Sequence, residues 1–247
     1  MLVNSDKNIS IYFGDALTDR VAHRSSVGVY CSEYKKFCLD LTEQFNLDHL
    51  VFEHQTHGLN GMVVEQLQQS SDKVTLDKVT LFERDGDWLV TNQKKIGLGV
   101  LTADCLPLVF YDKIHQAVGI AHAGWKGTVA HIGQKVIEVM KKNYGSNPAD
   151  LQVFFGPSAR PCCYEVGAEF EQYMTDEQLC TSLVKRDGKL FFDNACYNTI
   201  ELLRAGVTKQ NFNYKYHVCT ICNNSFHSYR RSGKKELCQA TIVYLNG

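Results

Sequence analysis

Two short apolar runs that each end in chemically reactive residues restrict the possible folds of this chain more than any other feature. The run at 97–101 leads into TADC (102–105), and the run at 117–121 leads into HAGWKG (122–127). Continuous apolar runs bounded by turn residues are typical of buried strands. A third apolar run at 106–111, followed by a turn at Asp112, predicts a hairpin that brings Cys105 close to His122. Reactive residues where strands end are typical of functional sites.

The remaining hydrophobic patterns predict strands interleaved with helices. Further strands are expected at 9–13, 50–52, 62–64, 88–91, 151–155 and 239–245, and a hairpin at 183–192. Helical spacing predicts helices that begin at Ser32, after Gly127 and at Asn194, with a short one near 170–174. Two segments without periodicity, 14–28 and 70–84, are expected to be a loop and a surface insertion.

Composition narrows the class of protein. Of the 247 residues, 44% are hydrophobic and 21% charged, as in ordinary globular proteins, and the net charge of −1 argues against a nucleic-acid binder. No run is long enough to cross a membrane, and the first residues lack the charged and apolar parts of a signal peptide. We therefore expect a cytoplasmic protein whose ten cysteines are reduced, with no obligatory protein partner evident.

The reactive residues suit a metal centre. Cys105, His122 and one of the two histidines in the loop after strand 50–52, His54 or His57, would supply one sulfur and two nitrogens. Three such ligands with an open fourth position form the pattern of catalytic zinc, which makes bound water a nucleophile at neutral pH. Asp104 could orient the thiolate or carry protons. A metal-free alternative stays open, in which Cys105 is a nucleophile and His122 its base.

Other polar residues suit an anion site and, less strongly, a structural metal. Lys126 and Arg230 are cationic residues near glycine-rich or loop backbone, and such groups can hold phosphate. For Arg231, an ordinary solvated charge is the preferred interpretation. Cys219 and Cys222 form a CxxC pair that could be half of a zinc site. Because no second CxxC or close histidine pair accompanies it, we do not favour structural zinc there.

Five motifs, taken together in this order, resemble the YfiH-like family, long labelled laccase-domain or multicopper polyphenol oxidase. They are HQTHG (54–58), TADCLPLVF (102–110), GIAHAGWKGT (119–128), GPSARPCCYEVG (156–167) and FHSYRR (226–231), and the resemblance covers about 50–245. It implies an α+β fold of mixed β-sheets flanked by helices, as a single domain over 1–247, which agrees with the predicted elements. It also implies a purine nucleoside phosphorylase that uses phosphate and acts on adenosine, inosine and S-methyl-5′-thioadenosine, with adenosine deaminase activity.

By the same resemblance the zinc ligands are His57, Cys105 and His122, with His54 a neighbour. Lys126 stands where the family usually has arginine, and the family's glycine-rich N-terminal segment is not found within 14–30. Two other functions stay open: a cysteine-based amidase that edits peptidoglycan precursors, and a copper-dependent polyphenol oxidase. Nine scattered histidines lack the His-x-His density expected for clustered copper, although copper can occupy a site with nitrogen and sulfur ligands.

Overall fold

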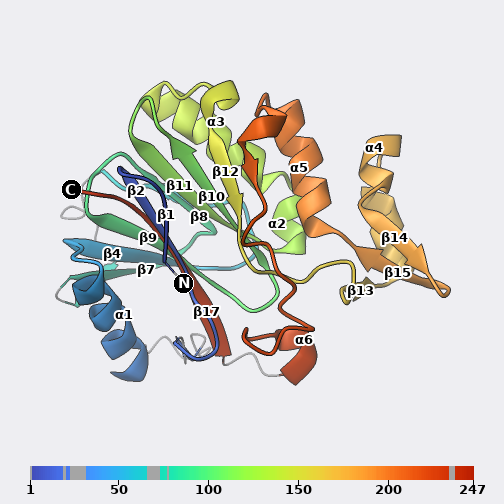
Figure 1. Ribbon diagram of the computed structural model, residues 1–247, viewed down its shortest axis with the longest axis horizontal. Helices are drawn as coiled ribbons and strands as arrows, with labels where there is room; N and C mark the ends of the chain where they lie inside the picture. The colour runs from blue at the N-terminus through green and yellow to red at the C-terminus, as the bar shows by residue number, and fades with distance from the viewer. Residues whose placement is uncertain (1, 19–20, 23–31, 66–72, 77, 234–236) are drawn as a thin grey trace.

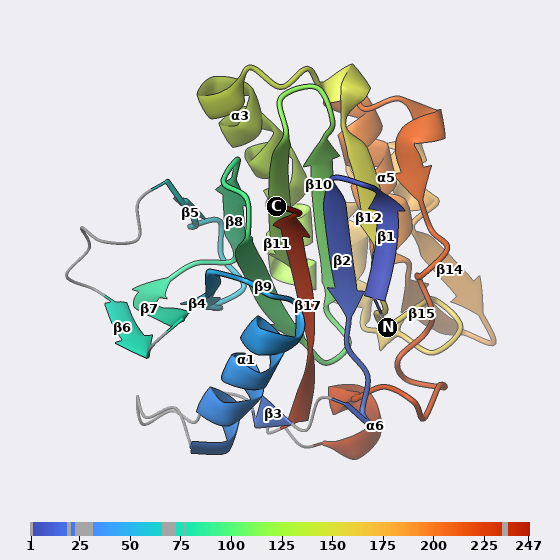
Figure 2. The same cartoon turned by 60° about the vertical axis from the view of Figure 1, so that its left-hand side comes forward.

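The structure is a computed structural model that describes residues 2–18, 21–22, 32–65, 73–76, 78–233 and 237–247 (Figure 1). At its centre two β-sheets stack face to face, and helices cover their outer faces (Figure 2). This arrangement confirms the expected α+β class with mixed sheets flanked by helices. Within the described residues, no helix combines the length and the apolar character that a membrane crossing requires.

The first sheet carries the segments that precede two of the candidate site residues. Its strands, in spatial order, are β1 (Leu2–Asp6), β2 (Ile9–Phe13), β17 (Leu237–Leu245), β9 (Ile96–Thr102), β4 (His49–His54), β7 (Val79–Asp85) and β6 (Lys73–Leu76), with β3 (Val21–Ala22) beside β17. β9 pairs antiparallel with β17 and parallel with β4. The parallel pairing of β9 and β4 places their carboxyl ends, followed by Cys105 and His57, at the same edge.

The second sheet carries His122. Its strands, in spatial order, are β16 (Phe212–Asn213), β12 (Gln152–Phe155), β10 (Leu106–Asp112), β11 (Ala117–Ala123), β8 (Trp88–Thr91) and β5 (Met62–Val63). β10 and β11 form the predicted antiparallel hairpin, in which Pro107 lies opposite His122. Cys105 immediately precedes β10, so the hairpin register brings it beside His122.

The central strands β9, β10 and β11 are buried on both faces, which explains why their sequences are continuous apolar runs. Alternate residues such as Ile11 of β2, Val109 of β10 and Val243 of β17 fill the space between the sheets. The other face of the second sheet packs against α3 (Ile132–Tyr144) and α5 (Asn194–Arg204). The other face of the first sheet packs against α1 (Ser32–Gln44). The molecule therefore has four layers in the order helix, sheet, sheet, helices (Figure 2).

A small third sheet projects from one side of this stack, next to α5 (Figure 1). Its strands are β13 (Glu165–Val166), β15 (Lys189–Phe192) and β14 (Leu183–Arg186). The remaining elements are short helices: α2 (Trp125–Val129), α4 (Glu177–Cys180) and α6 (Tyr229–Ser232), and the 3-10 turns η1 (Pro148–Asp150), η2 (Ala168–Tyr173) and η3 (Lys209–Asn211). Phe192 is fully buried where this sheet meets Phe170 and Tyr197.

Three sequence-based expectations are wrong. The segment 70–84, expected to be a surface insertion, contains the antiparallel strands β6 and β7, which extend the first sheet through the pairing of β7 with β4, while 70–72 and 77 lie outside the described residues. The helix expected after Gly127 is broken into α2 and α3 at His131, whose left-handed backbone (φ 66°) cannot continue a helix. The predicted loop at 14–28 contains β3, which pairs with β17, and its other part at 19–20 and 23–28 lies outside the described residues.

Candidate metal and catalytic centre

His57, Cys105 and His122 meet at the edge where strands of both sheets end. One ligand atom from each lies within 4.8 Å of the other two, and the Cys105 Sγ and His57 Nε2 are 3.6 Å apart. The imidazole rings of His57 and His122 are arranged edge to face, with centroids 4.6 Å apart. His122 is buried and His57 is exposed, so the group is accessible from the His57 side. The sequence-based prediction that these three loops converge therefore agrees with the geometry.

Asp87, which immediately precedes β8, holds two of these residues in place. Its carboxylate accepts a 2.7 Å hydrogen bond from His122 Nδ1. It also accepts hydrogen bonds from the backbone N–H groups of Thr56, His57 and Gly58, at 3.1, 3.0 and 2.7 Å. Although burial opposes ionisation, these donors lower the pKa of Asp87, so the carboxylate is charged. The sequence analysis does not single out Asp87, because nothing local shows which loop folds over it.

Two further contacts fix the loop that carries His57. The Gln55 side-chain amide donates to the carbonyl of Leu101 (2.8 Å) and accepts from the N–H of Leu101 (2.7 Å), which ties the loop to the end of β9. Gly124 leaves room for the group, because a Cβ there would lie 2.5 Å from His57 Cδ2 and 3.2 Å from Cys105 Sγ. The motifs HQTHG and HAGW thus contain residues that position the centre as well as residues that form it.

The charges of Cys105 and His122 depend on each other. Burial opposes ionisation of the Cys105 thiol, but the charge of His122 and hydrogen bonds from His122 and His57 outweigh it and lower the pKa of Cys105 to about 6. Burial likewise opposes the imidazolium, but the Cys105 thiolate and the hydrogen bond to Asp87 raise the pKa of His122 to about 9. At neutral pH the thiol is therefore a thiolate, the form that both metal ligation and nucleophilic attack require.

Asp104 connects Cys105 to two distant segments. Its carboxylate accepts hydrogen bonds from Thr220 Oγ1 (2.6 Å), Ser228 Oγ (3.0 Å) and the backbone N–H of Arg230 (2.7 Å). Its carbonyl accepts from the N–H of Ala159 (2.9 Å). Asp104 has a left-handed backbone with φ 91°, an unfavourable conformation that these contacts hold in place. The contacts give Asp104 a positioning role; a role as proton carrier stays a prediction.

Arg230 lies beside Asp104, next to the centre. Its guanidinium lies over the ring of Tyr164, 5.0 Å from the centroid, and donates to the carbonyl of Glu165 (3.1 Å). Burial and the negative charges of Cys105 and Asp104 raise the pKa of Tyr164, so its hydroxyl stays protonated. Tyr164 is a neighbour of the centre that the sequence did not reveal, because nothing in the motif at 156–167 distinguishes this residue from those around it.

The other singled-out residues are placed differently. Lys126 is exposed on α2, with its ammonium 5.8 Å from the ring centroid of Trp125. His54 Nδ1 lies 2.8 Å from Asp85 Oδ1, in an exposed pair outside the group of three. Arg231 is not a purely solvated charge, because its guanidinium donates to the carbonyls of Thr220 and Ile221 at 2.7 and 2.9 Å.

The donor set fits one ion better than a copper cluster. The group has one thiolate and two imidazoles, and Asp87 orients one imidazole through the ring nitrogen that faces away from the group; this donor set is typical of catalytic zinc. In the described part of the chain, the only other group of three or more possible ligands consists of four cysteines. Neither group offers the several clustered imidazoles that a multicopper centre needs.

Replacing Asp87 with asparagine tests this arrangement. The amide keeps one acceptor oxygen but removes the charge that orients His122, so we expect zinc affinity to fall about 10- to 100-fold. Competition with a chromophoric chelator measures the change. Asp85→Asn is the matched control, because that exposed carboxylate pairs with His54 instead, and it should leave the affinity unchanged. Equal losses in both variants would contradict the assigned role of Asp87.

Glu53, on β4 near Gly86 and Asp87, has a strongly perturbed carboxyl group. Its side chain is 2% exposed, and one oxygen lies 3.3 Å from Arg84 Nε while the other has no hydrogen-bond partner among the described residues. Burial raises the pKa of Glu53 from 4.5 to about 8, with Arg84 opposing. The folded protein therefore keeps this proton between pH 4.5 and 8, where the unfolded chain releases it.

This retained proton should make the protein less stable as pH rises. Between these limits the Glu53 contribution lowers the free energy of unfolding by about 1.4 kcal/mol per pH unit. Glu53→Gln should remove that slope and be more stable than wild type above pH 8, as measured by urea unfolding at pH 5, 7 and 9. Asp85→Asn, which replaces an exposed carboxylate, should keep the wild-type dependence of stability on pH. An unchanged slope in Glu53→Gln would show that Glu53 is ionised in the folded protein.

The chain matches one family model and resembles enzymes named for reactions on nucleosides. The family model described as multi-copper polyphenol oxidoreductase laccase matches residues 35–246. A purine nucleoside phosphorylase of Borreliella burgdorferi is 38% identical over 153 residues, which are 60% of this chain and 64% of that protein. One from Clostridium acetobutylicum is 30% identical over 232 residues, 93% of this chain and 89% of that protein. Adenosine deaminase RL5, from an unknown prokaryotic organism, is 35% identical over 76% of this chain and 72% of that protein.

Solved structures share the fold. The crystal structure of the hypothetical protein YfiH from Bacillus licheniformis superposes with a TM-score of 0.84, covers 99% of each chain and is 23% identical in sequence. The architecture of stacked mixed sheets with outer helices is therefore one already seen in crystals.

Proposed function

Since this chain belongs to the multi-copper polyphenol oxidoreductase laccase family, we propose that it is a zinc-dependent purine nucleoside phosphorylase that also deaminates adenosine. The relatives named purine nucleoside phosphorylase and adenosine deaminase support an enzyme that processes nucleosides. Adenosine, inosine and S-methyl-5′-thioadenosine are the proposed substrates, with phosphate as the second substrate. The observation that carries the proposal is the convergence of His57, Cys105 and His122 on one accessible point, backed by Asp87.

The proposed phosphorolysis needs a held phosphate and a stabilised leaving base. A phosphate oxygen forms a bond to C1′ of the sugar as the bond from C1′ to the purine nitrogen breaks, and the purine takes up a proton. Arg230, packed on Tyr164 and exposed beside Asp104, is proposed to bind the phosphate, with Lys126 as a second cation. Asp104 acts as a positioning residue, because it fixes the backbone N–H of Arg230. Orientation of both substrates supplies much of the rate.

The metal-ligand group is proposed to bind the purine side of the substrate. His57, Cys105 and His122 would hold zinc, which when bound would supply a Lewis acid for departure of the base and for attack of water on C6 of adenine, as the bond from C6 to the amino group breaks and ammonia leaves. The charge on Asp87 keeps the His122 nitrogen that faces away from Cys105 protonated, so the other nitrogen is available as a ligand. The centre needs a reduced Cys105, which suits the cytoplasm. Copper is kept as an alternative occupant of the same ligands.

Product analysis tests the function. Purified protein is incubated with adenosine, inosine and S-methyl-5′-thioadenosine, each with and without phosphate. Phosphate-dependent release of free purine would identify phosphorolysis, and inosine formed from adenosine would identify deamination. Absence of both products from zinc-loaded protein would refute the proposal. Oxidation of a phenol by oxygen in copper-loaded protein, without nucleoside turnover, would instead support the copper oxidase alternative.

A second function is favoured by one specific observation. Hydrogen bonds connect the Cys105 thiolate to the His122 imidazolium, and the imidazolium to the Asp87 carboxylate. Enzymes that attack amides with a cysteine use the same arrangement. The matching activity would be an amidase that edits peptidoglycan precursors. Chelation separates the two mechanisms: amide hydrolysis that survives complete zinc removal requires the thiol mechanism, whereas nucleoside turnover that is lost and returns with added zinc requires the metal.

A further inference from the structure

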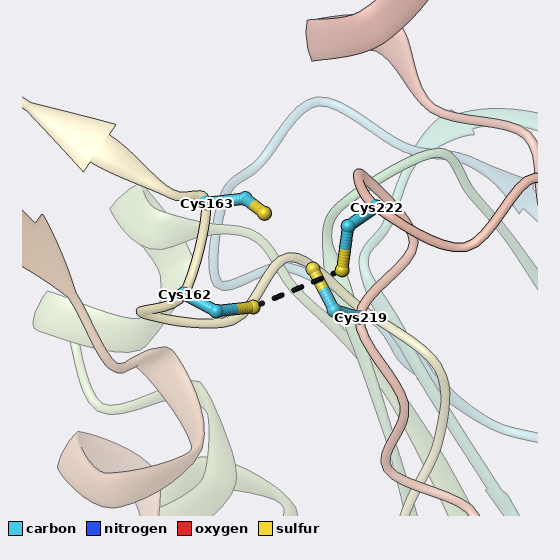
Figure 3. Close-up of side chains that lie close together, drawn as sticks. All are labelled: Cys162, Cys163, Cys219 and Cys222. Carbon is cyan, nitrogen blue, oxygen red and sulfur yellow. Dashed lines mark hydrogen bonds between the residues drawn. The ribbon is translucent and has the colours of Figure 1, made fainter.

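Four cysteines from two distant segments converge at a second place in the molecule. Cys162 and Cys163 lie in the loop between β12 and β13, and Cys219 and Cys222 lie in the segment between β16 and α6. Figure 3 shows the four side chains directed toward one another from these two segments. All four Sγ atoms lie within 4.8 Å of one another, and those of Cys162 and Cys222 are 4.0 Å apart.

These separations match a tetrahedral metal site. Zinc–sulfur bonds of about 2.3 Å in a regular tetrahedron place the sulfur atoms about 3.8 Å apart, so the observed spacing requires little movement. A disulfide would require about 2.05 Å, roughly half the separation of Cys162 and Cys222. The structure shows all four cysteines as free thiols. Four cysteines whose sulfur atoms surround one point are the ligand set of a closed, structural zinc site.

The surroundings are also those of a thiolate-bound metal. The backbone N–H groups of Ile221 and Cys222 donate hydrogen bonds to the Cys219 sulfur, which stabilise a charged ligand. Arg186 donates to the carbonyl of Cys162 (3.1 Å), and Arg231 donates to the carbonyl of Ile221 (2.9 Å). These two guanidinium groups bring positive charge to both loops. They favour the charge of −2 that four thiolates and one Zn²⁺ carry together.

We propose that Cys162, Cys163, Cys219 and Cys222 bind a structural zinc ion. On binding, each thiol that is still protonated releases its proton to solvent, and four sulfur–zinc bonds form with no change in oxidation state. The site crosslinks the loop that carries Tyr164 to the segment that carries Thr220 and Arg230. It thereby fixes, relative to each other, the two segments whose Ala159 and Thr220 donate hydrogen bonds to Asp104. The site is separate from the His57, Cys105 and His122 group and does not depend on the activity proposed for that group.

Zinc content per chain tests the proposal on the full-length protein. Wild-type protein purified under reducing conditions and loaded with zinc should contain two equivalents by elemental mass spectrometry. Cys222→Ser should contain one, and its remaining zinc should be lost only when Cys105 is also replaced. Cys180→Ser is the matched control, because Cys180 is an exposed cysteine outside both groups, and it should keep two equivalents. A Cys222→Ser variant that retains the full zinc content of the wild type would overturn the proposal.

Two measurements that do not use Cys222→Ser keep the proposal testable if that variant does not fold. Alkylation followed by peptide mass spectrometry should show that zinc protects Cys162, Cys163 and Cys222, while exposed Cys180 reacts equally with and without zinc. X-ray absorption of the Cys105→Ala protein should show only sulfur at about 2.3 Å around its remaining zinc. Unprotected thiols, or a disulfide within the group after purification under reducing conditions, would refute the site.

Discussion

Replacement of Cys105 by alanine should lower kcat/KM for inosine phosphorolysis at least about 10³-fold, a loss of about 4 kcal/mol of transition-state stabilisation. The side chain supplies the only sulfur of the group formed with His57 and His122, 3.6 Å from His57 Nε2, and its thiolate is one of the three ligands proposed for zinc. Without it, two imidazoles remain to hold the ion. The zinc content of this centre should therefore fall together with the activity.

The control for this loss is another cysteine. Cys180→Ala removes an exposed thiol outside both cysteine-containing groups and should keep full activity and zinc. Full inosine phosphorolysis by Cys105→Ala would remove the proposed role of the centre. If activity falls but wild-type protein keeps its activity after complete chelation, Cys105 acts as a nucleophile and the metal mechanism is wrong.

Replacement of Asp104 by alanine should have the second largest effect, on both stability and activity. The carboxylate accepts from Thr220, Ser228 and Arg230, and hydrogen bonds to charged groups contribute about 1.5–3 kcal/mol each when one partner is removed. Because losses within one network are not additive, we expect the free energy of unfolding to fall by about 3–5 kcal/mol. Displacement of the Arg230 backbone should raise KM for phosphate at least about tenfold.

Two variants separate these effects. Thr220→Val removes one donor to Asp104 and should lower stability by about 1–2 kcal/mol while leaving KM for phosphate near wild type. Arg230→Ala should raise KM for phosphate as Asp104→Ala does, with little loss of stability, since its exposed guanidinium is removed but its backbone N–H remains. If Asp104→Ala lowers stability but leaves KM for phosphate unchanged, Asp104 supports the fold alone.

Much of the central architecture could be predicted from the sequence because it depends on local patterns. The apolar runs before Cys105 and His122 are buried on both faces of their strands, so they appear as continuous hydrophobic segments. A hairpin register is set by a short turn, which is why Cys105 could be placed beside His122 from the sequence. The strands β6 and β7 could not be recognised, since β7 owes its place to its pairing with β4, and the edge strand β6 to its pairing with β7, rather than to a pattern of their own.

The contacts that turn these residues into a centre were decided only by the tertiary structure. Asp87 receives three backbone N–H groups from a loop about 30 positions earlier, and Asp104 receives donors more than 100 positions later. The sequence shows no second CxxC beside Cys219 and Cys222, but the fold places the adjacent Cys162 and Cys163 next to them. Sequence determines which segments are buried, because burial follows from local hydrophobicity. Which loops meet at the ends of those segments depends on how strands pair across two sheets, and no local pattern encodes it.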